Sequence, residues 1–203
     1  MNKGLKNIVL PVLFFSAIWG LSEAFLGGYL YRNGFQHASI PLTVIALVNL
    51  TVAKRYLSFA GSATLVAVFA MLYKFLNLPF FACHLLGIIL LGISYDIFFS
   101  LVKAKNSSLK AALTCIVAHV AFAFLITYVF RYEYWVTGSM KKIAEYVFIS
   151  GGLSAVLSAI AVPLTIRMMS TKEFGIKGKW ILPQTISYAC WFFAIGMFIK
   201  AIM

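Results

Sequence analysis

The chain has 203 residues, of which 63% are hydrophobic and only 11% are charged, and its mean hydropathy is +0.96. So few charged side chains could not cover a water-soluble globule of this size, so the composition excludes a soluble enzyme and a disordered chain. Lys and Arg number 17 against 5 Asp and Glu, which gives a net charge of +12. In so apolar a chain we interpret this excess as the positive-inside bias of a membrane protein rather than as a nucleic-acid-binding surface.

Seven apolar runs are predicted to form membrane-spanning helices. They cover residues 8–31, 39–53, 57–76, 81–102, 109–130, 143–167 and 181–203. A spanning helix needs about 20 residues, and six of the runs are long enough. The run 39–53 is short and could be a tilted span or a re-entrant segment, with Pro41 at its N-terminus. The expected fold is an all-α integral membrane bundle of about seven helices that forms a single domain over residues 1–203.

The N-terminus is expected to lie in the cytoplasm. Lys3 and Lys6 precede the first run as in a signal peptide, but the length of the run and the presence of Glu23 favour an uncleaved first span. With this orientation most Lys and Arg residues lie in inner loops, as the positive-inside rule requires. The compact loops favour a prokaryotic inner membrane.

The first predicted helix carries a series of small residues on the same face as Glu23, while Trp19 points elsewhere. The series is Ser16, Gly20, Ala24 and Gly28. Small residues four apart let two membrane helices approach closely, either within one bundle or between subunits. A carboxylate at mid-membrane depth is costly, so Glu23 is expected to point into protein. It could be a hydrogen-bonded structural residue or a contact for substrate, cation or proton.

Polar residues recur in the later spans. His84 is expected near the outer end of the fourth span, at the depth of Lys74, where the two could form a mouth for an anionic or polar ligand. Lys74 could instead extend to the membrane interface. His119 and Asp96 are both candidates to hydrogen-bond other helices, and Asp96 is expected to have a packing or capping role near the inner interface.

The outer loops contain most of the recognition chemistry. Residues 31–37, 74–79 and 131–135 combine aromatic, amide and charged side chains that could bind a small molecule, although an aromatic belt at the headgroups would have a similar composition. The isolated Cys83, Cys115 and Cys190 predict neither a metal site nor a disulfide. There is no Gly-rich phosphate loop and no hydrolase or metalloprotease motif, so we expect neither an enzyme nor a cofactor.

Three elements together resemble the substrate-binding S-components of energy-coupling factor (ECF) transporters. They are the small-residue series of the first helix, the short apolar segment 41–48 followed by the Gly- and Ala-containing segment 59–63, and the Leu- and Gly-rich segment 85–92 closed by Lys103 and Lys105. The resemblance covers roughly residues 10–130. S-components usually have six helices, so a seventh would be an addition.

The resemblance implies that the chain captures a vitamin-like nutrient from outside, while a separate transmembrane partner and ATPases drive its release. The small-residue series would dock to that partner. The outer mouth would hold the site, with Glu23 and His119 beneath it. The implied mouth residues are Arg32, Asn33, Gln36, His37, Lys74, Asn77, His84, Arg131, Tyr132, Glu133 and Trp135. The alternative is a self-contained permease that uses Glu23, His119 and Asp96 as a proton relay.

Overall fold

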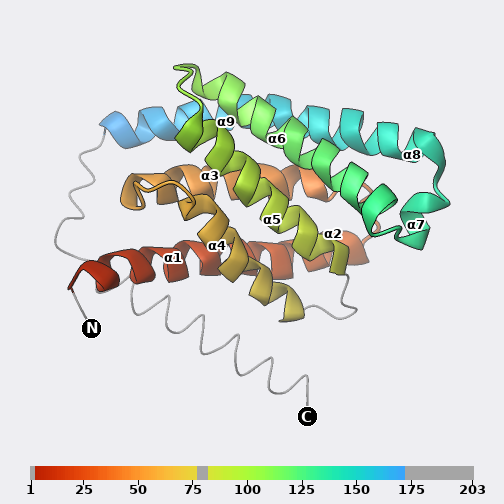
Figure 1. Cartoon of the computed structure of the whole chain (residues 1–203), viewed down its shortest axis with the longest axis horizontal. Coiled ribbons are helices and arrows are strands. Elements are labelled where there is room, and N and C mark those ends of the chain that lie inside the picture. Colours follow the sequence, from red (N-terminus) through yellow and green to blue (C-terminus); the bar gives the residue numbers. More distant parts are fainter. Residues whose placement is uncertain (1–2, 77–81, 172–203) are drawn as a thin grey trace, which may run out of the picture.

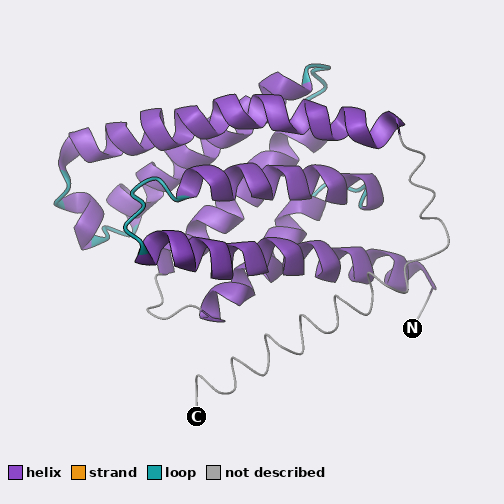
Figure 2. Cartoon of the chain, turned by 180° about the vertical axis from the view of Figure 1, so that it is seen from behind, coloured by secondary structure: helices purple, strands orange, loops and turns teal. Residues whose placement is uncertain are grey.

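The computed structural model describes residues 3–76 and 82–171, and in these ranges it contains helices and connecting loops but no strand (Figures 1 and 2). There are six long helical segments, several of which include a π or 3-10 turn (η), and one short helix, α7. The segments are α1–η1–α2 (Lys3–Leu21, Ser22–Leu26, Gly27–Arg32), α3 (Ser39–Tyr56), α4–η2 (Ser62–Met71, Leu72–Leu76), α5–η3 (Ala82–Asp96, Ile97–Leu101), α6–η4 (Ser107–Phe124, Leu125–Val129) and α8–η5–α9 (Ser139–Glu145, Tyr146–Gly151, Gly152–Thr171), with α7 at Glu133–Val136.

Four described helices are long and apolar enough to cross a membrane: Ile8–Arg32, Cys83–Leu101, Ser107–Val129 and Met140–Ser170. They correspond to four of the predicted spans, and a shorter apolar helix, Ser62–Leu76, corresponds to a fifth. The short run 39–53 becomes α3, a continuous helix of 18 residues. At 1.5 Å per residue it is about 27 Å long, close to the thickness of a bilayer core. The predicted span 181–203 lies outside the described residues.

The six segments pack in a closed ring whose order differs from the chain order. α1 packs on α4, α4 on α5, α5 on α6, α6 on α9, α9 on α3, and α3 on α1. Successive segments run in opposite directions, so the loops gather at two ends (Figure 1). We name them by composition. The basic end, at the left of Figure 1, is where α3, η3 and α9 end and α6 begins, and the aromatic end, at the right, is where α2 ends and α7 lies. By their positions on or beside these elements, the basic end carries Lys54, Arg55, Lys103, Lys105, Lys110 and Arg167, and the aromatic end carries Tyr29, Tyr31, Phe35, Tyr132, Tyr134 and Trp135.

The small-residue series of α1 is used for packing inside the ring. Ser16, Gly20 and Ala24 are buried, and a Cβ atom on Gly20 would overlap the ring of Tyr73. Gly28 lies in the wall of a cavity described below. The packing interpretation accounts for these contacts. Residues of this chain already cover three of the four positions of the series.

Outward side chains on the helices are apolar. On the first segment Ile18, Phe25 and Tyr29 are exposed, and on α9 Val156 and Ile160 are exposed. Inside the ring, small and branched side chains form one continuous core together with the aromatic rings of Phe15, Trp19 and Tyr95. Helices that are apolar both inside and outside the bundle are typical of membrane spans.

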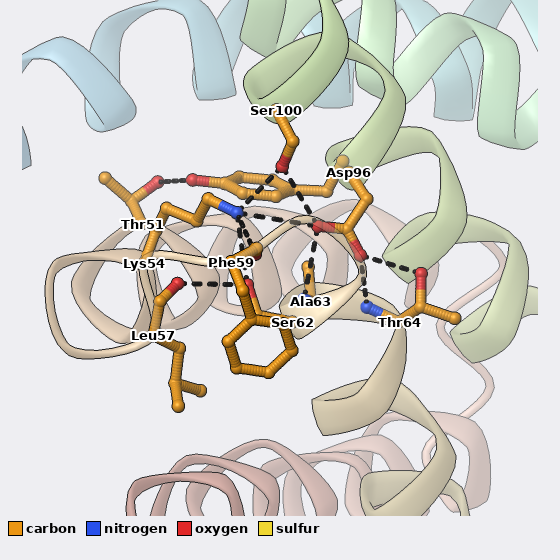
Figure 3. Close-up of polar contacts among 10 residues, drawn as sticks. Thr51, Lys54, Leu57, Phe59, Ser62, Ala63, Thr64, Asp96 and Ser100 are labelled. Carbon is orange, nitrogen blue, oxygen red and sulfur yellow. Dashed lines mark hydrogen bonds and ion pairs between the residues drawn. The ribbon is translucent and has the colours of Figure 1, made fainter. Parts of the chain in front are cut away.

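Asp96 joins three segments at the basic end (Figure 3). Its Oδ2 atom accepts hydrogen bonds from the backbone N–H of Thr64 at 2.7 Å and from the Thr64 hydroxyl at 2.8 Å, and its Oδ1 atom accepts one from the N–H of Ala63 at 3.3 Å. Lys54 of α3 lies 3.8 Å from the same carboxylate. The first N–H groups of a helix have no partner within the helix, so Asp96 caps α4 from α5. The predicted capping role is confirmed.

Candidate functional site

A cavity of about 780 Å³ lies at the aromatic end, and all six long segments contribute to its wall. Its size is within the range of small-molecule sites, roughly 300–1,000 Å³. The exposed residues Arg32, Gln36, His37, Tyr132, Tyr134 and Glu145 form its rim. The buried side chains of Trp19, Glu23, Lys74 and His119 form its floor. The cavity therefore leads from an exposed mouth to a polar floor within the bundle.

The floor contains a buried ion pair between Glu23 and Lys74. The Nζ atom of Lys74 lies 3.0 Å from Oε2 of Glu23 and donates a hydrogen bond of 2.9 Å to the backbone oxygen of the same residue. The side chains are 2% exposed for Lys74 and 11% exposed for Glu23. The alternative that Lys74 extends to the membrane interface is wrong, because its ammonium group points into the protein.

Local backbone geometry makes this pair possible. Glu23 lies on η1, a π turn of the first segment, and Lys74 lies on η2, a 3-10 turn that continues α4. Gly27 leaves room between them, since a Cβ atom there would lie 3.2 Å from Leu42 and 3.5 Å from the Lys74 ammonium. π turns occur often at functional sites, where they redirect a side chain. Here the π turn places a carboxylate in the cavity wall.

Two other floor residues, His119 and Trp19, hold polar atoms that have no partner in the part of the chain that the structure describes. Nδ1 of His119 lies 2.8 Å from the backbone oxygen of Cys115. A carbonyl oxygen can only accept, so Nδ1 carries the hydrogen and Nε2 of the neutral ring is an acceptor. This Nε2 atom and the indole N–H of Trp19 are both buried without a hydrogen-bond partner among the described residues. Such groups cost free energy unless something pairs with them.

Aromatic rings form two walls of the cavity. Tyr31 and His84 stack with their ring centroids 4.9 Å apart and their planes inclined by 17°. On another side, Tyr146 and Trp135 meet edge to face at 5.0 Å, and Phe122 lies 5.5 Å from Trp135. These distances are typical of favourable aromatic pairs. The walls are therefore largely aromatic.

All three histidines of the chain line this cavity. His84 and His119 belong to α5 and α6, and His37 lies in the loop that precedes α3. Nδ1 of His37 lies 3.0 Å from the hydroxyl oxygen of Ser150 on η5. This contact joins the loop at residues 33–38 to a segment more than 100 residues later in the chain. The contact therefore connects the loop to η5 on another side of the cavity.

Most of the residues predicted as a site line the cavity. They are Glu23, Arg32, Gln36, His37, Lys74, His84, His119, Tyr132 and Trp135. Asn33 does not, and its amide instead donates to the backbone oxygen of Tyr29 at 2.8 Å, at the end of α2. Arg131 and Glu133 are exposed outside the lining, and Arg131 has a left-handed φ of 49°. Asn77 lies outside the described residues.

Several lining residues were not predicted as site residues. Trp19, Phe122, Tyr146 and Ser150 all belong to helical segments whose sequences indicate only membrane-spanning apolar runs. Tyr146 and Ser150 are four residues apart on η5, and this spacing is the one signal that could have paired them. Trp19 was assigned to a different face from Glu23, yet both lie in the same wall.

Asp96 is not part of this cavity. It lies at the basic end, where it caps α4, so the proposed relay residues are not brought together. Among the described residues no three His, Cys, Asp or Glu side chains are grouped so that they could hold a metal ion.

Comparison of the chain with protein-family models, with curated proteins and with solved structures finds no match.

Proposed function

We propose that this chain is a membrane-embedded substrate-capture subunit of a micronutrient uptake system, and that it binds a small molecule in the cavity at the aromatic end. The cavity carries the proposal, because it combines an exposed rim, aromatic walls and a buried polar floor in one space of suitable volume. Its residues come from all six long segments, so binding would depend on the whole bundle rather than on one loop.

The distribution of charge supports capture from outside. Lys54, Arg55, Lys103, Lys105 and Lys110 gather at the basic end, opposite the mouth of the cavity. The positive-inside rule assigns such an end to the cytoplasm. The mouth of the cavity then faces the outer side of the membrane, where a nutrient would be met.

The resemblance to ECF S-components supports a division of labour. The described residues form six long helical segments, which is the usual number of helices in those proteins. We therefore assign energy coupling to a separate transmembrane partner and ATPases. Because three of the four residues of the small-residue series are buried, we do not assign docking to it. A Gly20→Leu variant would disturb the contact with Tyr73 and so test folding rather than docking.

The second candidate is a proton-coupled permease. Glu23 and His119 share the cavity, which favours a role for both in binding or proton transfer. Asp96 lies at the other end with its carboxylate already engaged by α4. A permease would therefore rely on two of the three residues. Uptake by the purified chain alone in vesicles, driven by a pH gradient and lost in Glu23→Gln, would favour this candidate over the capture subunit.

A ligand screen with a cavity-blocking variant tests capture. The protein would be screened in detergent micelles against vitamins and their precursors by thermal shift. Gly87 lines the cavity, and a Cβ atom there would meet only the ring of Phe122 at 3.7 Å, so Gly87→Leu should fold and reduce the space for ligand. We expect it to abolish the shift caused by any ligand found.

Gly152→Leu is the matched control. Gly152 is also a helical glycine, but a Cβ atom there would meet nothing within 4 Å and the residue does not line the cavity. This variant should keep the ligand response. If Gly87→Leu responded as strongly as Gly152→Leu, the ligand would bind elsewhere and the cavity would not be the site. Copurification of a transmembrane partner with ATPases would test the division of labour separately.

A further inference from the structure

The floor of the cavity has a defined charge and hydrogen-bonding character that restricts its ligand. We infer, on the basis of the proposed function, that the cavity takes an uncharged, planar heteroaromatic molecule that carries both a hydrogen-bond donor and an acceptor on its ring edge. The inference rests on three independent features of the wall: the neutralised ion pair, the two unpartnered polar atoms and the flat aromatic surfaces.

The first feature is electrical neutrality at depth. Apart from the neutral imidazole of His119, the buried acid and base in the described wall are Glu23 and Lys74, and they pair with each other at 3.0 Å. An anionic ligand would compete with Glu23 for the ammonium group, and a cationic ligand would compete with Lys74 for the carboxylate. Either would leave one buried charge without its partner, which is strongly unfavourable. An uncharged ligand leaves the pair intact.

The second feature is a matched acceptor and donor. Nε2 of His119 is an acceptor, because Nδ1 of the same ring donates to the Cys115 carbonyl. The indole N–H of Trp19 is a donor and nothing else. Both atoms are unpartnered among the described residues, and both side chains are at least nine-tenths buried in the cavity wall. A ligand that donates to His119 and accepts from Trp19 would satisfy both.

The third feature is the shape of the walls. The Tyr31 ring of α2 and the His84 ring of α5 stack nearly parallel to each other, and both residues line the cavity. Phe122, Trp135 and Tyr146 form the aromatic cluster on another side. Flat aromatic surfaces make their most favourable contacts with a planar ring, by offset stacking or by edge-to-face packing. A flexible aliphatic ligand would gain less from them.

Four bicyclic probes separate these requirements. Quinazolin-4-one is uncharged and carries an N–H beside a carbonyl group. Its N-methyl derivative lacks the donor, quinoline-4-carboxylate is an anion, and N-methylquinolinium is a cation. Binding to the full chain in micelles would be measured by equilibrium dialysis. We expect quinazolin-4-one to bind at least about tenfold more tightly than each of the others, since one hydrogen bond is typically equivalent to about a tenfold change in affinity.

Variants of the floor residues test whether these residues cause the preference for quinazolin-4-one. In His119→Phe, quinazolin-4-one and its N-methyl derivative should bind within about twofold of each other, while His119→Gln, which keeps an acceptor oxygen, should retain a preference. Trp19→Phe should weaken the binding of quinazolin-4-one about tenfold. This variant provides the test if His119→Phe does not fold. Ser154→Ala is the matched control, because the Ser154 hydroxyl is also buried without a partner among the described residues but does not line the cavity.

The outcomes separate this inference from the proposed function. Tightest binding of the cation or the anion, abolished by Gly87→Leu, would overturn the ligand class and leave small-molecule capture standing. Equal binding of quinazolin-4-one and its N-methyl derivative to the wild-type chain, or no binding of any of the four probes, would also overturn the ligand class. The wider ligand screen described above would then decide whether the cavity is a binding site at all.

Discussion

Removal of one member of the Glu23–Lys74 pair should destabilise the fold far more than removal of both. Lys74→Met keeps the length of the side chain but leaves the Glu23 carboxylate without its cation. Glu23→Gln keeps the shape but leaves the ammonium group without its anion. In the double variant no charge remains at the floor of the cavity. The three variants and the wild type form a double-mutant cycle that isolates the interaction between the two side chains.

The magnitude follows from the distance and the burial. At 3.0 Å two unit charges attract with about 5.5 kcal/mol at an effective dielectric constant of about 20. Much of this offsets the cost of removing both charges from water. Breaking a buried pair from one side costs about 3–5 kcal/mol, whereas replacing both members by neutral residues is close to neutral. In a chain of this size, each kcal/mol of lost stability lowers Tm by about 2–4 °C. The Tm of each single variant should therefore fall by roughly 6–20 °C.

Thermal unfolding in detergent micelles, followed by circular dichroism at a helical wavelength, would measure the four Tm values. Lys141→Met is the control, because Lys141 lies 4.0 Å from Glu145 with side chains that are 85% and 53% exposed. Exposed pairs of this kind contribute little, so its Tm should stay close to that of the wild type. If either single variant unfolded within about 2 °C of the wild type, or if the double variant lost the sum of both single losses, the ion pair would not stabilise the fold as argued.

Two further variants test contacts between helices. Asp96→Ala removes the cap of α4 and leaves Lys54 without its carboxylate, so Tm should fall by several degrees, and Asp96→Asn, which keeps one acceptor oxygen, should fall less. If Asp96→Ala and Asp96→Asn lowered Tm equally, the loss of the negative charge rather than the loss of the cap would explain the effect. Gly92→Val should abolish the monodisperse folded peak in size-exclusion chromatography, because a Cβ atom there would lie 2.5 Å from the Cβ of Ala67, whereas Gly152→Val, which meets open space, should elute as the wild type does.

The helical architecture could be predicted because hydropathy is a local property. Runs of about 20 apolar residues predict spans without knowledge of their neighbours. Four of the predicted spans correspond to helices long enough to cross a membrane, and the short run 39–53 is a full helix, α3. The capping role of Asp96 could also be predicted, because a carboxylate is stabilised near the N-terminus of a helix.

The pairing within the site could not be predicted from the sequence. Glu23 and Lys74 are 51 positions apart, and they meet because α1 packs on α4, an arrangement that no local pattern specifies. The face assigned to Trp19 was wrong for a different reason. Trp19 and Glu23 are four residues apart. On a helical wheel such residues are separated by only about 40°, so ordinary α geometry already places both on one face.

The order of the helical ring has a consequence for the assembly of the cavity. The segment α8–η5–α9 packs on both α6 and α3, so the ring is closed only when this segment is in place. Tyr146 and Ser150 of the same segment line the cavity. A chain in which this segment has not yet joined the bundle therefore lacks part of the cavity wall, and ligand binding reports a completed bundle.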